Sequence, residues 1–144
     1  MGPIMTTITE AYNLIKDPEH WTQGFYQKNK EGKNCPWREG YSFCAMGSLN
    51  FISGLKERDD SYHGALCILQ RHSEKLFGSC IRTVNDSSPP AIAHQNVLRV
   101  YESVMERFSD RDPTEEEWTE GVWPKSHQKS QPQAIRFGEN TSVA

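Results

Sequence analysis

Residues 20–49 read HWTQGFYQKNKEGKNCPWREGYSFCAMGSL. This stretch holds two of the four tryptophans, two of the four cysteines and four of the ten glycines of the chain. It begins with an aromatic turn at Trp21, passes through a charged loop and ends in an apolar segment from Phe43 to Leu49. Such a concentration of special residues is typical either of the packing centre of a small domain or of the lining of a site.

Within this stretch, residues 20–33 are predicted to be extended and to form a small β-hairpin, with Gly32 at a left-handed turn position. An irregular loop follows. Ser42 is then predicted to cap a helix that runs to Leu55. Gly47 lowers the helix propensity of that segment. A glycine at such a position indicates that another backbone comes close, and the nearest candidate is the turn at residues 21–24.

Three further helices are predicted, one before the loop-rich stretch and two after it. Residues 6–17 carry an apolar stripe after a Thr6 or Thr7 cap, and Asp17-Pro18 ends the segment. Residues 61–77 and 90–108 show the same helical period. Residues 80–84 alternate and are β-branched, which predicts a short strand. The predicted fold class is therefore mainly α (α+β), with about four helices, a small hairpin and one short extra strand.

The chain has 144 residues, which suits one domain. We predict a compact domain over residues 5–121 and a polar, flexible tail over residues 122–144. The tail accounts for part of the low apolar content of 35%, against about 45–50% in ordinary domains. Residues 1–4, which include Gly2-Pro3 ahead of a second methionine, are given no structural role.

The composition excludes several classes of protein. The net charge of -3 argues against non-specific binding to nucleic acid, which needs a positive field. No run approaches the ~18 apolar residues of a membrane span, and the start of the chain does not resemble a signal peptide. The expected location is the cytoplasm, where the four cysteines would stay reduced.

Charge is distributed unevenly along the chain. Residues 106–120 hold seven acidic and two basic residues, whereas residues 25–41 hold four basic and two acidic ones. Charge runs of this kind usually form solvated surfaces. They can also mark places where a partner of opposite charge docks.

The order of these features resembles a family of small, mostly uncharacterised proteins found in phages and actinobacteria. That resemblance covers roughly residues 8–108 and departs from the family pattern at residues 87–90. It implies a shared fold and says little about activity. The residues that carry it are Trp21, Gln23, Gly24, Gly32, Phe43, Cys44, Ala45, Gly47, Leu49, Asn85 and Asp86.

Cys44 is the strongest candidate for chemistry. It is predicted in the first turn of a helix, where free N–H groups and the helix dipole lower a thiol pKa. A nucleophilic site would also need a base and an orienting group. Asp86 or Asn85 could orient the base, and Gln23 could stabilise an oxyanion; the candidate bases are His20, His63 and His94. The competing interpretation is that Cys44 is a small buried apolar residue.

A metal site is a weaker hypothesis. His63 and Cys67 are four residues apart on one predicted helix, and Cys35, Cys44 and Cys80 could add thiolates. No Cys-x-x-Cys pair anchors such a set, and no phosphate-binding glycine loop or HExxH signature is present. We therefore predict no metal and no cofactor.

Two functions from different classes are compatible with the sequence. The first, which we favour, is a non-enzymatic phage or mobile-element accessory protein that binds and modulates, for example inhibits, a protein in the cytosol of its host. The second is a cysteine-dependent enzyme, using Cys44, His94 and Asp86, or a small-ligand-binding protein with a pocket around Cys44, Asn85 and Asp86. Tryptophan, tyrosine and arginine are the usual anchors of protein interfaces. The predicted binding residues of the first function are Trp37, Arg38, Tyr41, Glu115, Glu116 and Trp118.

Overall fold

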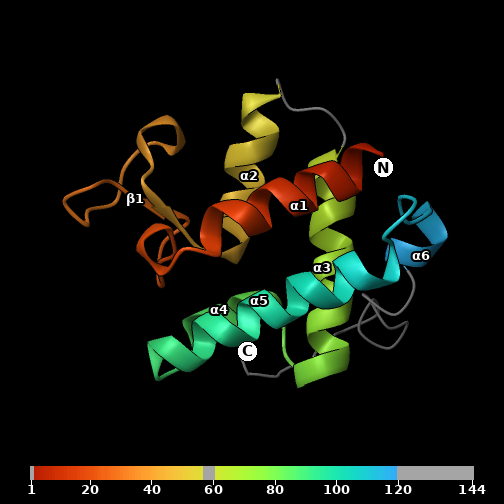
Figure 1. Ribbon diagram of the computed structural model, residues 1–144. Helices are drawn as coiled ribbons and strands as arrows, with labels where there is room; N and C mark the ends of the chain where they lie inside the picture. The colour runs from red at the N-terminus through yellow and green to blue at the C-terminus, as the bar shows by residue number, and fades with distance from the viewer. Residues whose placement is uncertain (1, 57–60, 120–144) are drawn as a thin grey trace, which may run out of the picture.

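The computed structural model describes residues 2–56 and 61–119. The fold is mainly α with a small antiparallel sheet, as predicted (Figure 1). The predicted tail, residues 122–144, lies outside the described residues. In chain order the elements are α1 (Pro3–Ile15), η1 (Pro18–His20), β1 (Gln27–Lys28), η2 (Trp37–Glu39), β2 (Ser42–Phe43), α2 (Ala45–Leu55), α3 (Ser61–Phe77), α4 (Ile81–Asp86), α5 (Pro90–Arg107) and α6 (Glu115–Thr119).

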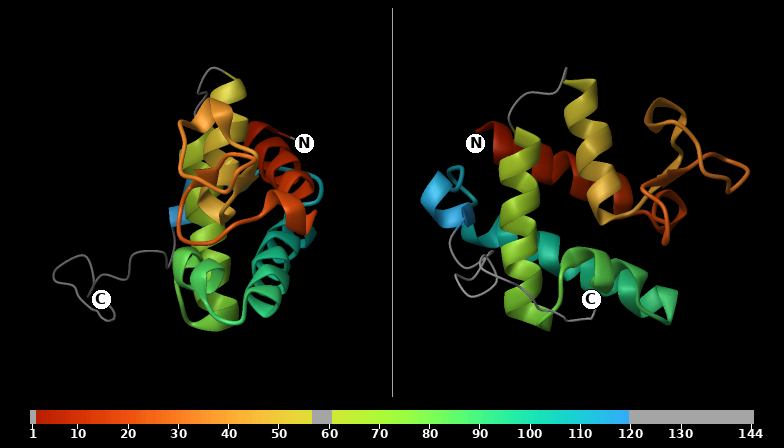
Figure 2. Two further views of the ribbon diagram at one scale, coloured as in Figure 1. Left: turned by 90° about the vertical axis from the view of Figure 1, so that its left-hand side faces the viewer. Right: turned by 180° about the vertical axis from the view of Figure 1, so that it is seen from behind.

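The four longer helices α1, α2, α3 and α5 share one hydrophobic core. Its members recur at helical spacing, so each helix turns one apolar stripe inward. Figures 1 and 2 show the sheet and its loops at one end of the molecule and α6 at the other, beside the N-terminus. The largest fully buried side chains are Tyr101, Phe43, Phe108, Met5, Ile8, Ile15, Leu49, Ile68, Leu69, Ile81, Val97 and Val100.

Two helices match their predicted bounds closely. The helix predicted over residues 61–77 is α3, and Gly78 follows it with a φ of 67°. A left-handed glycine directly after a helix is the usual C-terminal stop. The helix predicted over residues 90–108 is α5, with Phe108 as its C-cap.

The small sheet includes a strand that lies outside the predicted hairpin of residues 20–33. β1 pairs with β2, with Gln27 opposite Phe43 and Lys28 opposite Ser42. The tight turn around Gly32 (φ 80°) is present and is closed by a bridge between Lys28 and Asn34. The second partner of β1 therefore comes from the start of the apolar segment, after the loop that contains η2.

The strand predicted over residues 80–84 is wrong, because these residues begin helix α4. Ile81 and Val84 are both buried, which suits the i, i+3 spacing of a helix, whereas in a strand they would face opposite sides of the sheet. The N–H of Ile81 donates to Oε1 of Gln70 on α3, at 2.6 Å. A side chain from another helix thus accepts from the first N–H group of α4, whereas the N-cap residue Cys80 makes no such hydrogen bond.

The predicted start of the first helix is also wrong. α1 begins at Pro3, and the carboxylate of Asp112 accepts hydrogen bonds from the N–H groups of Ile4 and Met5, both at 2.9 Å. Residues 2–4 therefore belong to the fold, contrary to our expectation. The negative charge also suits the positive end of the helix dipole.

The cap of α2 differs from the prediction by two residues. Ser42 lies in β2, and Cys44 is the N-cap. Similarly, Pro89 rather than Ser88 is the N-cap of α5.

Gly47 allows a backbone to approach α2, as predicted. A Cβ atom at this position would lie against the carbonyl oxygen of Tyr26, far inside van der Waals contact. The same oxygen accepts the N–H of Cys44 at 3.1 Å. The approaching chain is therefore the segment leading into β1, two residues beyond the turn that we expected.

We predict that Gly47→Ala lowers the free energy of unfolding by about 1–3 kcal/mol, measured by urea denaturation. Alanine improves helix propensity by about 1 kcal/mol over glycine, so a net loss would show that the contact with Tyr26 prevails. Gly64→Ala in α3 is the matched control, because its Cβ would meet chiefly the flexible end of Ile4. An equally large loss at Gly64, or none at Gly47, would contradict the close approach.

Candidate functional site

A pocket of about 270 Å³ lies between the N-terminus of α2, helix α4 and the segment leading into β1. It contains the three residues of the second functional hypothesis, Cys44, Asn85 and Asp86. The complete lining is Gly24, Phe25, Tyr26, Gln27, Asn34, Cys44, Ala45, Met46, Arg82, Asn85 and Asp86.

Asn85 forms the floor of this region and is 1% exposed. Its Oδ1 accepts hydrogen bonds from Nε1 of Trp21 (2.8 Å) and from the N–H of Ala45 (2.9 Å). Its Nδ2 donates to the carbonyl oxygen of Thr22 (3.1 Å) and to Oδ1 of Asp86 (2.9 Å). One amide group therefore joins the aromatic turn, the start of α2 and α4.

The turn that precedes β1 is fixed to the same helix by further hydrogen bonds. Nε2 of Gln23 donates to the carbonyl oxygens of Asn85 (2.9 Å) and Ser87 (2.6 Å). The N–H of Gly24 donates to Oδ1 of Asp86 at 3.0 Å. Both N–H groups of the Gln23 amide are therefore used in contacts within the protein. Neither is left to stabilise an oxyanion, which is the role that we considered for Gln23.

Cys44 lies at the pocket, but its thiol is not activated. Burial raises the pKa of Cys44, and the N–H of Gly47, which donates to Sγ at 3.2 Å, only partly opposes this effect. The lowering of the pKa that we expected at a helix N-terminus is therefore wrong, because desolvation of the thiolate outweighs the backbone donors.

The candidate bases lie away from Cys44, outside the lining of the pocket. Nε2 of His94 is 2.7 Å from the carbonyl oxygen of Ile15, and its ring packs against Trp21. His20 contacts the carbonyl oxygen of Tyr41 through Nδ1. His63 lies on α3, with its ring against Trp118 and its Nε2 3.8 Å from Sγ of Cys67. The structure does not bring Cys44, His94 and Asp86 together as a catalytic set.

Three of the predicted binding residues lie on the loop between the strands, outside the lining of the pocket. The ring of Trp37 is partly buried against Phe51 and Gly54 of α2, and the guanidinium of Arg38 stacks over it at 5.0 Å. The hydroxyl of Tyr41 donates to Glu19, and Nζ of Lys30 lies 5.6 Å from the centre of its ring.

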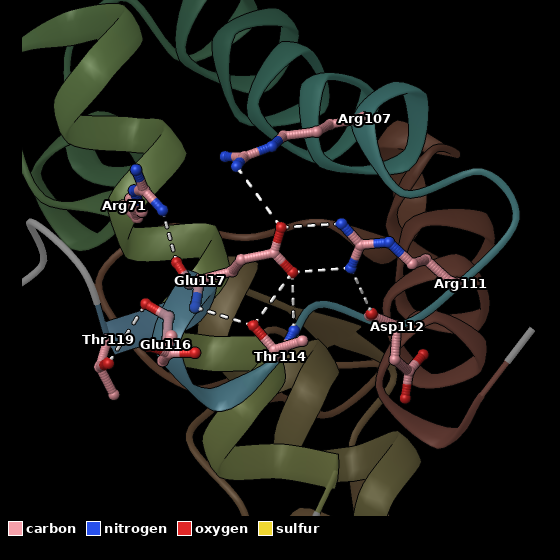
Figure 3. A network of polar contacts seen from close by, with 8 residues as sticks. All are labelled: Arg71, Arg107, Arg111, Asp112, Thr114, Glu116, Glu117 and Thr119. Atoms are coloured by element: carbon pink, nitrogen blue, oxygen red, sulfur yellow. Dashed lines mark hydrogen bonds and ion pairs between the residues drawn. The ribbon is translucent and has the colours of Figure 1, made fainter.

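The other three predicted binding residues belong to α6. Glu115 and Glu116 are exposed, whereas Trp118 is partly buried against α3. Figure 3 shows that the neighbouring Glu117 turns inward to Arg111, Arg107 and Thr114. The hydrogen bond from Arg111 is the main reason that the pKa of Glu117 falls to about 2.

The two parts of the predicted interface are at opposite ends of the molecule. The loop that carries Trp37 lies at the end with the sheet, and α6 lies at the opposite end in Figure 1 and in the right-hand view of Figure 2. A single small partner could not contact both. The acidic and the basic segment are therefore separate surfaces.

Sequence reasoning missed Arg82 as a site residue. It was assigned to a strand, whereas in α4 it is one helical turn from Asp86 and both line the pocket. The signal that could have found it is the i, i+4 spacing of these two charges. Phe25 and Tyr26 also line the pocket and are 47% and 54% exposed.

Residues 2–56 and 61–119 hold neither a metal-binding cluster nor a membrane-spanning helix. No three histidine, cysteine, aspartate or glutamate side chains of this part of the chain are grouped so as to hold a metal ion. Nor does it contain a helix that is both long and apolar enough to cross a membrane. Comparisons of the chain with models of known families, with curated proteins and with solved structures find no significant match.

Removal of the Asn85 amide should destabilise the protein strongly. Asn85→Ala leaves two N–H donors and the Thr22 carbonyl without their partner in a buried place, so we expect a loss of about 2–4 kcal/mol in the free energy of unfolding. Asn85→Asp should also destabilise, because a carboxylate would face the two oxygens to which Nδ2 now donates. Asn96→Ala on α5 is the matched control and should cost less than about 1 kcal/mol.

The state of the Cys44 thiol can be tested by alkylation. We expect iodoacetamide at neutral pH to label Cys80 faster than Cys44, as measured by peptide mass spectrometry over time, because desolvation raises the pKa of Cys44 and so disfavours its thiolate. Labelling of all four cysteines in denaturant is the control. Faster labelling of Cys44 in the folded protein would restore the hypothesis of a cysteine-dependent enzyme.

Proposed function

We propose that this chain is a non-enzymatic binding protein that recognises another protein through the sheet end of the molecule. We define this sheet end as residues 23–41 together with Arg82 and Asp86. The observation that carries the proposal is the exposure of Phe25 and Tyr26, whose side chains are about half exposed next to a turn that hydrogen bonds fix to Asn85 and Asp86. Large aromatic side chains on a rigid support are typical centres of protein interfaces.

Cation–aromatic pairs support the same surface. Nζ of Lys28 lies 5.4 Å from the centre of the Phe25 ring, and the Lys30–Tyr41 and Arg38–Trp37 pairs have the same arrangement. Such pairs contribute about 0.5–1 kcal/mol at exposed sites. They therefore reduce the freedom of long side chains before a partner arrives, which lowers the entropic cost of binding.

The resemblance to small phage and actinobacterial proteins makes a protein of a bacterial host the partner that we propose. Binding of this kind would modulate or inhibit the host protein. The cysteine-dependent enzyme is the weaker alternative, because the thiol pKa is raised and none of the candidate bases lines the pocket. The acidic α6 end does not belong to the proposed interface.

Capture from an actinobacterial lysate tests the proposal when variants are compared. We expect a protein retained by the natural chain to be lost with Phe25→Ala/Tyr26→Ala and reduced with Trp37→Ala/Arg38→Ala. Glu74→Ala/Lys75→Ala, which changes two exposed residues of α3, is the control and should retain it. Equal retention by every variant, or loss with the control as well, would contradict the proposed surface.

A further inference from the structure

We propose that the pocket beside Cys44 receives a carboxylate side chain of the partner, with Arg82 as the residue that binds it. This inference rests on the proposed function and names the chemical group that the sheet end recognises. The pocket, rather than the exposed aromatic residues around it, would then select the partner. Its volume of about 270 Å³ lies just below the range of about 300–1,000 Å³ that is usual for small-molecule sites. A single side chain suits this space better than a whole cofactor.

Most polar groups of the pocket are already occupied by the protein itself. Asn85 uses both ends of its amide, Nε2 of Gln27 donates to the carbonyl oxygen of Cys35, and Sγ of Cys44 accepts from Gly47. Arg82 differs, because within the described part of the chain its guanidinium has no hydrogen bond or ion pair, and its side chain is exposed. A guanidinium offers five N–H donors in a planar fork, which matches the two oxygens of a carboxylate.

The remaining lining suits the apolar part of such a side chain and its neighbours. Phe25, Ala45 and Met46 contribute apolar surface, and methionine adapts readily to a ligand of irregular shape. Tyr26 and Asn34 at the exposed side of the pocket are neutral, so they add polar groups without repelling an anion. The preferred target is therefore an aspartate or glutamate next to an apolar residue.

Asp86 is the one acidic group in the lining, and its charge opposes an incoming carboxylate. Oδ1 of Asp86 already accepts from the N–H of Gly24 and from Nδ2 of Asn85, and these donors offset part of that charge. Arg82 and Asp86 together therefore favour one carboxylate bound at the guanidinium over a run of acidic residues.

An array of short random peptides with amidated C-termini is the probe, and it is applied to the full chain. We expect the natural protein to bind members that carry Asp or Glu beside an apolar residue, and to bind the matching Asn or Gln peptides about tenfold more weakly. Arg82→Gln should lose this discrimination, so that both members of each pair bind equally. Lys75→Gln, which makes the same charge change at an exposed position of α3 outside the pocket and outside the sheet end, should keep it. Asp86→Asn should strengthen binding of the acidic peptides.

Several results would overturn the inference. They are an absence of bound peptides, a lack of preference for acidic members, or an equal loss with Lys75→Gln, which would indicate a diffuse electrostatic effect. A second array with free C-termini separates the two sources of carboxylate, and binding only in that array would contradict the side-chain assignment. If Arg82→Gln captures the host protein as well as the natural chain does while Phe25→Ala/Tyr26→Ala does not, this inference fails and the proposed function stands. Thermal unfolding of each variant confirms that it is folded.

Discussion

The buried amide of Asn85 is the constraint on which the sheet end depends. It accepts two hydrogen bonds and donates two, and its four partners come from the aromatic turn, the start of α2 and α4. Few side chains can do this, because the site needs an acceptor on one side and a donor on the other. In a buried environment each unmade bond is costly, so the amide fixes the distance between these segments. The aromatic turn, the start of α2 and α4 are thus held at fixed positions, and the pocket is the space that remains between them.

Asn85 is also one of three side chains that satisfy the start of a helix from a distant part of the chain. The N–H groups at the start of α1 donate to Asp112, that of Ala45 in α2 donates to Asn85, and that of Ile81 in α4 donates to Gln70. In α6 the arrangement is local, because Thr114 and Glu117 bond reciprocally to each other's backbone N–H, and α2 adds a local contact in which Sγ of Cys44 accepts from the N–H of Gly47. The N-termini of α1, α2 and α4 are nevertheless tertiary contacts, and each couples the formation of a helix to packing elsewhere.

This coupling explains which predictions from sequence succeeded. α3 and α5 carry long apolar stripes, and Gly78 ends α3 locally, so their bounds were predictable. The starts of α1 and α4 were not predictable, because the side chains that accept from their first N–H groups lie 108 and 11 positions away in the sequence. Cys44, Asn85 and Asp86 line one pocket, because Asn85 and Asp86 end α4 and Cys44 begins α2 at the same end of the fold. Counting charges along the chain, in contrast, could not show that the basic loop and α6 lie at opposite ends of the molecule.

The contact between Asp112 and the start of α1 has a consequence for how the protein is made. A ribosome synthesises α1 about 100 residues before the carboxylate that completes its first turn, and elongation proceeds at about 5–20 residues per second. α1 must therefore wait several seconds without the acceptor for its leading N–H groups, and its apolar face waits a similar time for α5. The start of α1 can reach its native contacts only when residue 112 has left the exit tunnel, so α1 cannot complete its packing progressively as it is synthesised.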